Sequence, residues 1–201
     1  MGLEFLPLLA LFLVGATSLI LFMITDWRYG ILILAIQYIG VFLLTLIQLP
    51  LTMAVVKLVA GWMAGAVLGM AMVSIPDLRQ EMEGESGKRL VASRPFYLIA
   101  AMLVAMVVIS LADFALAWFP DIQPEQALGG LFLIGMGLFK LGFTVQPLQA
   151  TLGLLTALSG FEIIYATIET SALVVGLLAG ITLGLALAGA YLLMAPHMEE
   201  A

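Results

Sequence analysis

Long apolar stretches separated by short polar ones dominate the pattern of this 201-residue chain. A run of roughly 18 or more apolar residues is long enough to cross a bilayer as a helix. Seven such runs occur, near residues 3–25, 29–49, 51–75, 95–119, 127–146, 148–168 and 170–194. The runs are continuous instead of alternating, which favours helices over the strands of a transmembrane barrel. The pattern therefore predicts an all-α integral membrane protein with about seven transmembrane helices.

The composition supports this class, because 64% of the residues are hydrophobic and only 10% are charged. The one sizeable polar stretch covers residues 76–94 and is too short to form a catalytic domain. We therefore predict a single transmembrane domain over residues 1–201. Its front spans cover about residues 3–119, with the loop 76–94 among them, and a three-helix unit covers about residues 127–194.

Basic residues predict how the chain is oriented in the cell membrane. Arg28 follows the first span, and four more basic residues lie between the third and fourth spans: Arg79, Lys88, Arg89 and Arg94. Because cytoplasmic loops carry an excess of Lys and Arg, both of these loops are expected inside. An odd number of spans then places the N-terminus outside and the C-terminus inside.

The residue inventory excludes several kinds of chemistry. The chain has no cysteine, which removes disulfides and cysteine-ligated iron–sulfur clusters. Its only histidine, His197, lies after the last span, so the paired axial imidazoles of a membrane b-type cytochrome are missing. We therefore expect no catalytic site, cofactor or metal in this chain itself. The net charge of −6 is scattered without a charged block, so no nucleic-acid partner is expected.

Three charged residues inside apolar runs are the main functional clue. Glu162 lies within residues 148–168, Lys57 within 51–75 and Lys140 within 127–146. Ionisable groups inside a membrane are costly, and they often mark ion pathways or proton relays. Lys57 lies four residues before Gly61, so both are expected on one packed helix face that points into protein.

Depth along the predicted spans places three of the charges at a similar level. At about 1.5 Å per residue, Lys57, Asp113 and Glu162 each lie roughly 9 Å inside the outer end of their spans. They would form one polar cluster if their helices were neighbours, and Lys140 would continue a polar path towards the cytoplasm with Gln146 and Gln149. The alternatives are a structural Lys57–Glu162 ion pair, and snorkelling of Asp113 and Lys140 to the interface.

Small residues recur at helical spacing in two of the spans. The third span carries Gly61, Gly65 and Gly69, and the seventh carries Ala172, Gly176, Gly180, Gly184 and Ala188. Small residues let helix backbones approach closely, so both stripes are expected to pack against other helices. Such stripes are common in membrane proteins and carry little information about function.

Short motifs at both ends of the chain resemble known membrane subunits. The segments Gly160-Phe-Glu-Ile-Ile-Tyr165 and Ser171-Ala-Leu-Val-Val-Gly176 resemble the three-helix K subunit of respiratory complex I, whose middle helix carries a Gly-Leu-Glu motif. The segments Asp26-Trp-Arg-Tyr-Gly30 and Val55-Val-Lys57 are similar to component E of hydrogenase-4, a longer relative found in membrane-bound nickel-iron hydrogenases. The resemblance extends over nearly the whole chain.

This resemblance implies a membrane subunit of a complex I-like, ion-translocating assembly related to Na+/H+ antiporters. Its partners would be membrane lipid, antiporter-like subunits and a hydrogenase or dehydrogenase arm. Glu162 and Lys57 would be the ionisable relay residues, with Lys57 adjusting the proton affinity of Glu162. Two other functions stay open: a structural accessory subunit that holds antiporter-like chains in place, and a stand-alone transporter of small solutes.

Overall fold

The computed structural model describes residues 5–24, 26–74 and 94–198. Within these ranges the chain forms seven α-helices and no strand, which confirms the predicted all-α class. The helices are α1 (Phe5–Met23), α2 (Trp27–Thr45), α3 (Leu51–Ser74), α5 (Arg94–Trp118), α6 (Pro124–Gly142), α7 (Pro147–Tyr165) and α8 (Ala172–Met198). The predicted loop 76–94 lies outside the described residues, except that Arg94 begins α5.

Polar and proline residues mark where several helices begin. The Asp26 side chain caps α2 by accepting a hydrogen bond of 3.0 Å from the Arg28 backbone N–H. Pro124 and Pro147 occupy the first turns of α6 and α7, where a missing backbone N–H costs nothing. The predicted spans run past the ends of α2 and α6, because the turns there also contain apolar residues such as Ile47 and Val145.

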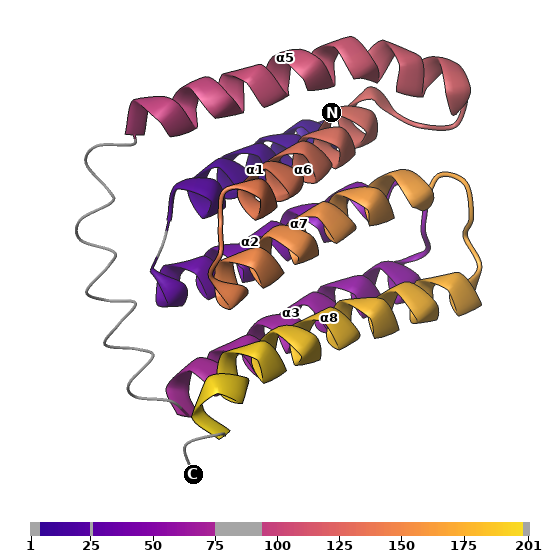
Figure 1. The fold of residues 1–201 in the computed structure, drawn as a ribbon. Helices are drawn as coiled ribbons and strands as arrows, with labels where there is room; N and C mark the ends of the chain where they lie inside the picture. Colours follow the sequence, from indigo (N-terminus) through magenta and orange to yellow (C-terminus); the bar gives the residue numbers. More distant parts are fainter. Residues whose placement is uncertain (1–4, 25, 75–93, 199–201) are drawn as a thin grey trace.

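Six of these helices pack as two stacked rows of three (Figure 1). One row contains α1, α2 and α3, and the other contains α6, α7 and α8. The rows lie with α1 against α6, α2 against α7 and α3 against α8, and each helix runs in the same direction as its counterpart (Figure 1). The second row therefore repeats the order and direction of the first, a parallel and not an inverted arrangement.

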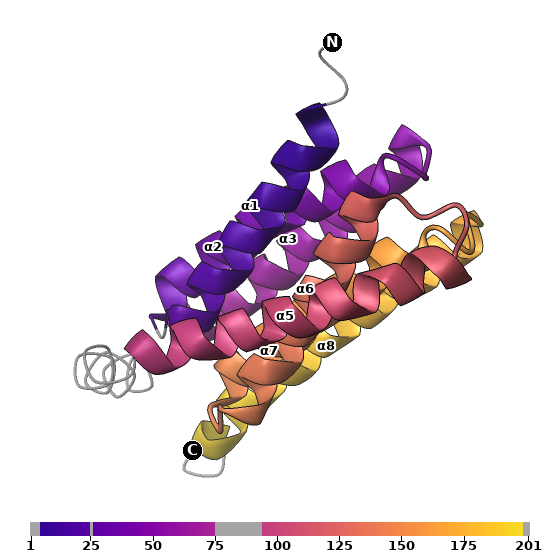
Figure 2. The same ribbon diagram turned by 90° about the horizontal axis from the view of Figure 1, so that it is seen from above.

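The remaining helix, α5, packs on the outside of the rows against α6 and, less extensively, α1. Figure 2 shows it crossing over α6. This leaves α6 surrounded by protein on several sides, and α6 is the one described helix that is not apolar enough to be a candidate membrane span on its own. Its sequence explains why, because it includes Glu125, Gln126 and Lys140.

The two termini of the described chain lie at opposite ends of the bundle. The N-terminal end of α1 lies at one end of the bundle, and the C-terminal end of α8 lies at the other (Figure 1). The start of α2, which carries Arg28, lies at the same end as the last turn of α8. The loop that carries Arg28 and the C-terminal end of α8 therefore lie on the same side of the bundle, as the basic residues predict. Which end of the bundle faces the cytoplasm stays a prediction.

Large apolar side chains cover the outer surface of the bundle. Phe12, Met106 and Leu173 are each more than two thirds exposed, although each lies within a long apolar helix. Water would not solvate such a surface favourably, whereas lipid tails do. Six described helices are long and apolar enough to span a membrane, so the chain is a multi-pass membrane protein in contact with lipid.

The two small-residue stripes have different surroundings. In α3, a Cβ added at Gly61 would collide with the Tyr38 ring, so this glycine allows α2 and α3 to approach closely. In α8 the whole predicted stripe is exposed, and no described atom lies within 4 Å of a Cβ built at Gly176, Gly180 or Gly184. Gly65 is also buried, and a Cβ built at Gly65 or Gly69 would lie 3.6 or 3.7 Å from Ile31 of α2. The expectation that both stripes pack is therefore confirmed for the α3 stripe, and the α8 stripe faces outwards from this chain.

Candidate functional site: a buried ion pair among four helices

Four helices enclose the volume in which the main candidate residues meet. Helix α2 packs on α3 and α7, and α8 packs on the same two helices, so the four form a square in cross-section. Lys57 of α3 and Glu162 of α7 come from one diagonal of this square. Tyr38 of α2 and Thr182 of α8 come from the other. The site therefore lies between the two rows of helices and draws on both.

Lys57 and Glu162 form an ion pair at the centre of this square. The Lys57 Nζ atom lies 3.5 Å from Glu162 Oε2, and both side chains are only 2% exposed. Such a pair is stable in a low-dielectric interior only while both charges are present, because a single buried charge carries a large desolvation cost. The predicted meeting of these two residues is confirmed.

Polar groups on the other diagonal complete the surroundings of the carboxylate. The Thr182 hydroxyl lies 3.4 Å from Glu162 Oε1 and 3.0 Å from the Leu178 carbonyl oxygen, and it can donate to either. The Tyr38 side chain, from the neighbouring helix α2, is buried as well. Among the described residues neither the Tyr38 hydroxyl nor the Lys57 ammonium has a hydrogen-bond partner. Within the described chain the carboxylate therefore has the Lys57 ammonium and the Thr182 hydroxyl as its side-chain polar contacts.

Close packing around Gly61 fixes where Lys57 and Tyr38 lie. The Tyr38 ring lies on the bare backbone of Gly61, which is one helical turn after Lys57. A side chain at position 61 would displace this ring and separate α2 from α3. The prediction that Lys57 shares the packed face of Gly61 is thus confirmed.

Lys140 is also buried, but its contacts differ from those of Lys57. It lies in the last turn of α6, is 6% exposed, and its Nζ donates a 2.7 Å hydrogen bond to the carbonyl oxygen of Leu21 in the last turn of α1. A cation at the C-terminal ends of two helices interacts favourably with their unsatisfied carbonyl groups. This geometry favours a structural role for Lys140, as a tie between α1 and α6.

We expect Lys140→Met to lower the free energy of unfolding by about 1–2 kcal/mol, because the Leu21 carbonyl loses its buried donor. Ion transfer per folded molecule should stay unchanged. Thermal unfolding in mild detergent measures the first quantity, and ion flux normalised to folded protein measures the second. A loss of ion flux without a loss of stability would instead show that Lys140 takes part in the proton relay.

Asp113 lies apart from the other candidate residues. It is exposed on α5, which packs mainly on α6 and lies outside the two rows. The expectation that Asp113, Lys57 and Glu162 form one cluster is therefore wrong for Asp113. The three residues lie at similar depth along their helices, but depth does not determine which helices are neighbours.

Other buried polar groups lie along the two helices beside the pair. Both amide atoms of Gln37, one residue before Tyr38, are buried without a hydrogen-bond partner among the described residues. On α7, Ser159 and Thr156 are buried and bond to carbonyl oxygens of their own helix. Gln149 is also buried, in the first turn of α7. These residues lead from Glu162 towards the opposite end of the bundle.

Sequence reasoning missed Tyr38 and Thr182 as parts of the site. Thr182 carries a weak signal, since it is the only serine or threonine in α8. Tyr38 carries a clearer one, because Gln37 and Tyr38 form a polar pair inside an otherwise apolar helix. Among the residues that the structure describes, no group of three His, Cys, Asp or Glu side chains is placed to hold a metal ion.

Fold and site together define a polytopic α-helical membrane protein with a buried, inter-row ion pair. Comparisons with protein-family models, with curated proteins and with solved structures found no match to this chain.

Proposed function

We propose that this chain is an integral-membrane subunit of a complex I-like, ion-translocating assembly, and that Lys57 and Glu162 transfer protons within it. The observation that carries this proposal is the 3.5 Å ion pair, buried between the two helix rows of a membrane protein. Intramembrane ionisable groups of opposite sign are characteristic of proton and ion pathways. The resemblance of the segments around Glu162 and Lys57 to hydrogenase-4 component E supports the same assignment.

A balanced cycle follows from the chemistry of the pair. A proton arriving from one side binds the Glu162 carboxylate, which leaves Lys57 as an unpaired buried ammonium. Lys57 then releases its own proton to the other side, so that both groups are neutral. Transfer of the proton from Glu162 to Lys57 restores the ion pair. One proton has then crossed the pair, and no redox step is involved.

The buried polar residues supply a route on the cytoplasmic side of the pair. Ser159, Thr156 and Gln149 follow one another along α7 away from Glu162. The unpartnered amide of Gln37 lies on the adjoining helix α2. Buried polar groups are normally hydrogen-bonded, and internal water is the usual partner where protein groups do not supply one. Such water would connect these side chains into a proton path.

Partner subunits are part of the proposal. The proposed partners are antiporter-like membrane subunits and a hydrogenase or dehydrogenase arm, because a chain with this inventory supplies no electron-transfer group of its own. The exposed small-residue stripe of α8 leaves room for a helix of another chain to approach closely. Catalysis would take place in those partners.

Glu162→Gln in the tagged, full-length chain tests the proposal. Glutamine keeps the shape of the side chain and an acceptor for Lys57, so we expect part of the variant to fold and to co-purify with the same subunits as the unaltered chain. Proton-coupled flux per assembled complex in reconstituted vesicles should fall by roughly tenfold or more. Mass spectrometry of the purified assembly and a pH-sensitive dye inside the vesicles measure the two results. Glu169→Gln is the matched control, because Glu169 follows α7, is exposed, and accepts a hydrogen bond from the nearby Ser171 backbone N–H.

The opposing function is a structural accessory subunit, in which the ion pair only holds α3 and α7 together. Unchanged flux in an assembled Glu162→Gln complex would support that function and overturn the relay. A chain that purifies without any other subunit would overturn the assembly itself. That second outcome would favour a stand-alone transporter.

A further inference from the structure

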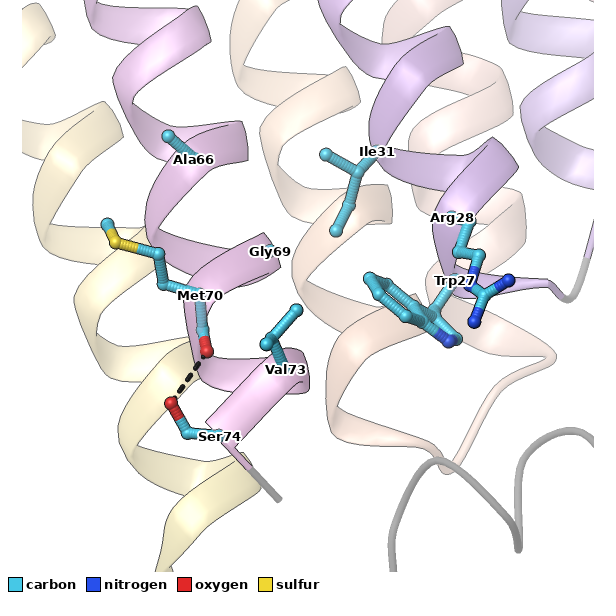
Figure 3. Close-up of a pocket in the computed structure, with 8 residues that line it drawn as sticks. All are labelled: Trp27, Arg28, Ile31, Ala66, Gly69, Met70, Val73 and Ser74. Atoms are coloured by element: carbon cyan, nitrogen blue, oxygen red, sulfur yellow. Dashed lines mark hydrogen bonds between the residues drawn. The ribbon is translucent and has the colours of Figure 1, made fainter. Parts of the chain in front are cut away.

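A membrane-facing groove lies between α2 and α3, at the end of the bundle where α2 begins and α3 ends (Figure 3). Its volume is about 620 Å³. Eight residues line it: Trp27, Arg28, Ile31, Ala66, Gly69, Met70, Val73 and Ser74. None of them belongs to the ion-pair site, so this groove is a separate feature of the chain.

The groove is apolar along most of its length. Its lining includes Gly69, which has no side chain, and Ala66, whose side chain is a single methyl group, and Ile31 lies on the facing helix α2 (Figure 3). Met70 and Val73 are 63% and 64% exposed at its rim. The lining on α3 extends from Ala66 to Ser74, or about 12 Å along the helix axis. These dimensions suit part of a lipid acyl chain better than a polar solute.

Two hydrogen-bond donors meet at the polar end of the groove. The Arg28 guanidinium lies 5.4 Å from the centre of the Trp27 ring. The Trp27 ring is only 8% exposed, yet its Nε1 has no hydrogen-bond partner among the described residues. Figure 3 shows this ring nitrogen on the side of Arg28. An indole nitrogen can only donate, so its missing partner is an acceptor.

We propose that this groove binds an anionic phospholipid, whose phosphate accepts hydrogen bonds from Arg28 and from Trp27 Nε1 and whose acyl chain lies along Ile31, Gly69 and Met70. Arginine binds phosphate through charge-assisted hydrogen bonds, and tryptophan favours the membrane interface. Basic sites between transmembrane helices bind anionic headgroups in this way. The apolar lining favours a lipid over free phosphate. This inference does not depend on the proposed proton relay.

Thermal unfolding of the full-length chain, together with any subunits that co-purify in mild detergent, tests the lipid site. Phosphatidylglycerol should raise the unfolding temperature more than phosphatidylcholine with the same acyl chains. Arg28→Gln should weaken the apparent affinity for phosphatidylglycerol by roughly tenfold, the loss expected for one charge-assisted hydrogen bond. Trp27→Phe should weaken it as well, since it keeps a ring and removes the donor. Tyr29→Phe is the control, because Tyr29 is exposed and outside the groove lining.

Gly69 provides a second, independent pair of variants for the acyl-chain part of the groove. A Cβ added there would lie 3.7 Å from Ile31, which is ordinary contact, so Gly69→Ala should fold and still bind lipid. Gly69→Phe should fill the groove and abolish the selective response. Equal responses to both lipids, or an Arg28→Gln variant with unchanged selectivity, would overturn the site. An equal response to glycerol 3-phosphate would show a free-anion site and overturn the lipid assignment.

Discussion

Lys57→Met and Glu162→Leu, made singly, are each expected to lower the free energy of unfolding by about 3–5 kcal/mol. Each substitution leaves the opposite charge buried without its partner, in side chains that are only 2% exposed. The surroundings offer little compensation, because the Thr182 hydroxyl, 3.4 Å from Glu162 Oε1, is the one side-chain hydrogen bond to the pair among the described residues. The singly substituted chains should therefore unfold at a clearly lower temperature in detergent than the unaltered chain.

The double variant Lys57→Met/Glu162→Leu should recover most or all of the lost stability. Replacing a whole buried ion pair by apolar residues of similar size is often neutral or stabilising. Thr182 would not be left without a bond, because its hydroxyl also lies 3.0 Å from the Leu178 carbonyl oxygen. Thermal unfolding of the four chains gives the coupling energy of the pair. Additive losses in the double variant would show that the two charges do not interact.

The same double variant separates the relay from the structural tie. Both functions predict recovered folding, but only a structural tie predicts recovered ion flux. If the pair transfers protons, the apolar double variant should assemble with its partners and transport nothing. Lys140→Met serves as the matched Lys-to-Met control, since Lys140 bonds to a carbonyl group and not to a carboxylate. Flux in a folded double variant would therefore exclude the relay.

Residue counting along the chain predicted the helices and the common level of Lys57 and Glu162, but not which helices are neighbours. Lys57 and Glu162 have the same predicted depth, and the four-residue spacing of Lys57 and Gly61 predicts the protein-facing side that the structure confirms. Asp113 was matched in depth as well, yet it lies on α5, outside both rows. Position along a helix follows from a fixed rise per residue, whereas lateral neighbours depend on packing between segments that are distant in sequence.

The glycines between α6 and α7 also show that the sequence pattern does not identify which helices pack together. Gly130 and Gly137 on α6 contact α7 near Gly160 and Gly153. On each helix the two glycines are seven residues apart, a spacing that keeps them on one face of closely packed antiparallel helices. The sequence contains this signal. The regular spacing of these glycines resembles that of the small residues in α8, which are exposed. Spacing alone therefore does not distinguish a face that packs within the chain from a face that points outwards.

Gly137→Ala should lower the free energy of unfolding by about 3 kcal/mol, the upper end of the usual cost of overpacking. The added Cβ would lie 2.5 Å from the Ala157 nitrogen and 2.6 Å from the Gly153 carbonyl oxygen. Both are backbone atoms of α7, so no side-chain rotation relieves the clash and the helices must separate. Because α7 also carries Glu162, the ion pair with Lys57 should lengthen or break in the same variant.

Gly180→Ala is the matched control, and its expected effect has the opposite sign. No described atom lies within 4 Å of a Cβ at position 180, so alanine replaces glycine in a helix without a clash. The higher helix propensity of alanine should then stabilise the isolated chain by up to about 1 kcal/mol. Unfolding of both variants in mild detergent measures the contrast. Equal effects would show that α6 and α7 do not approach as closely as the Gly137 contacts require, and that close packing of α7 does not hold Glu162 in place.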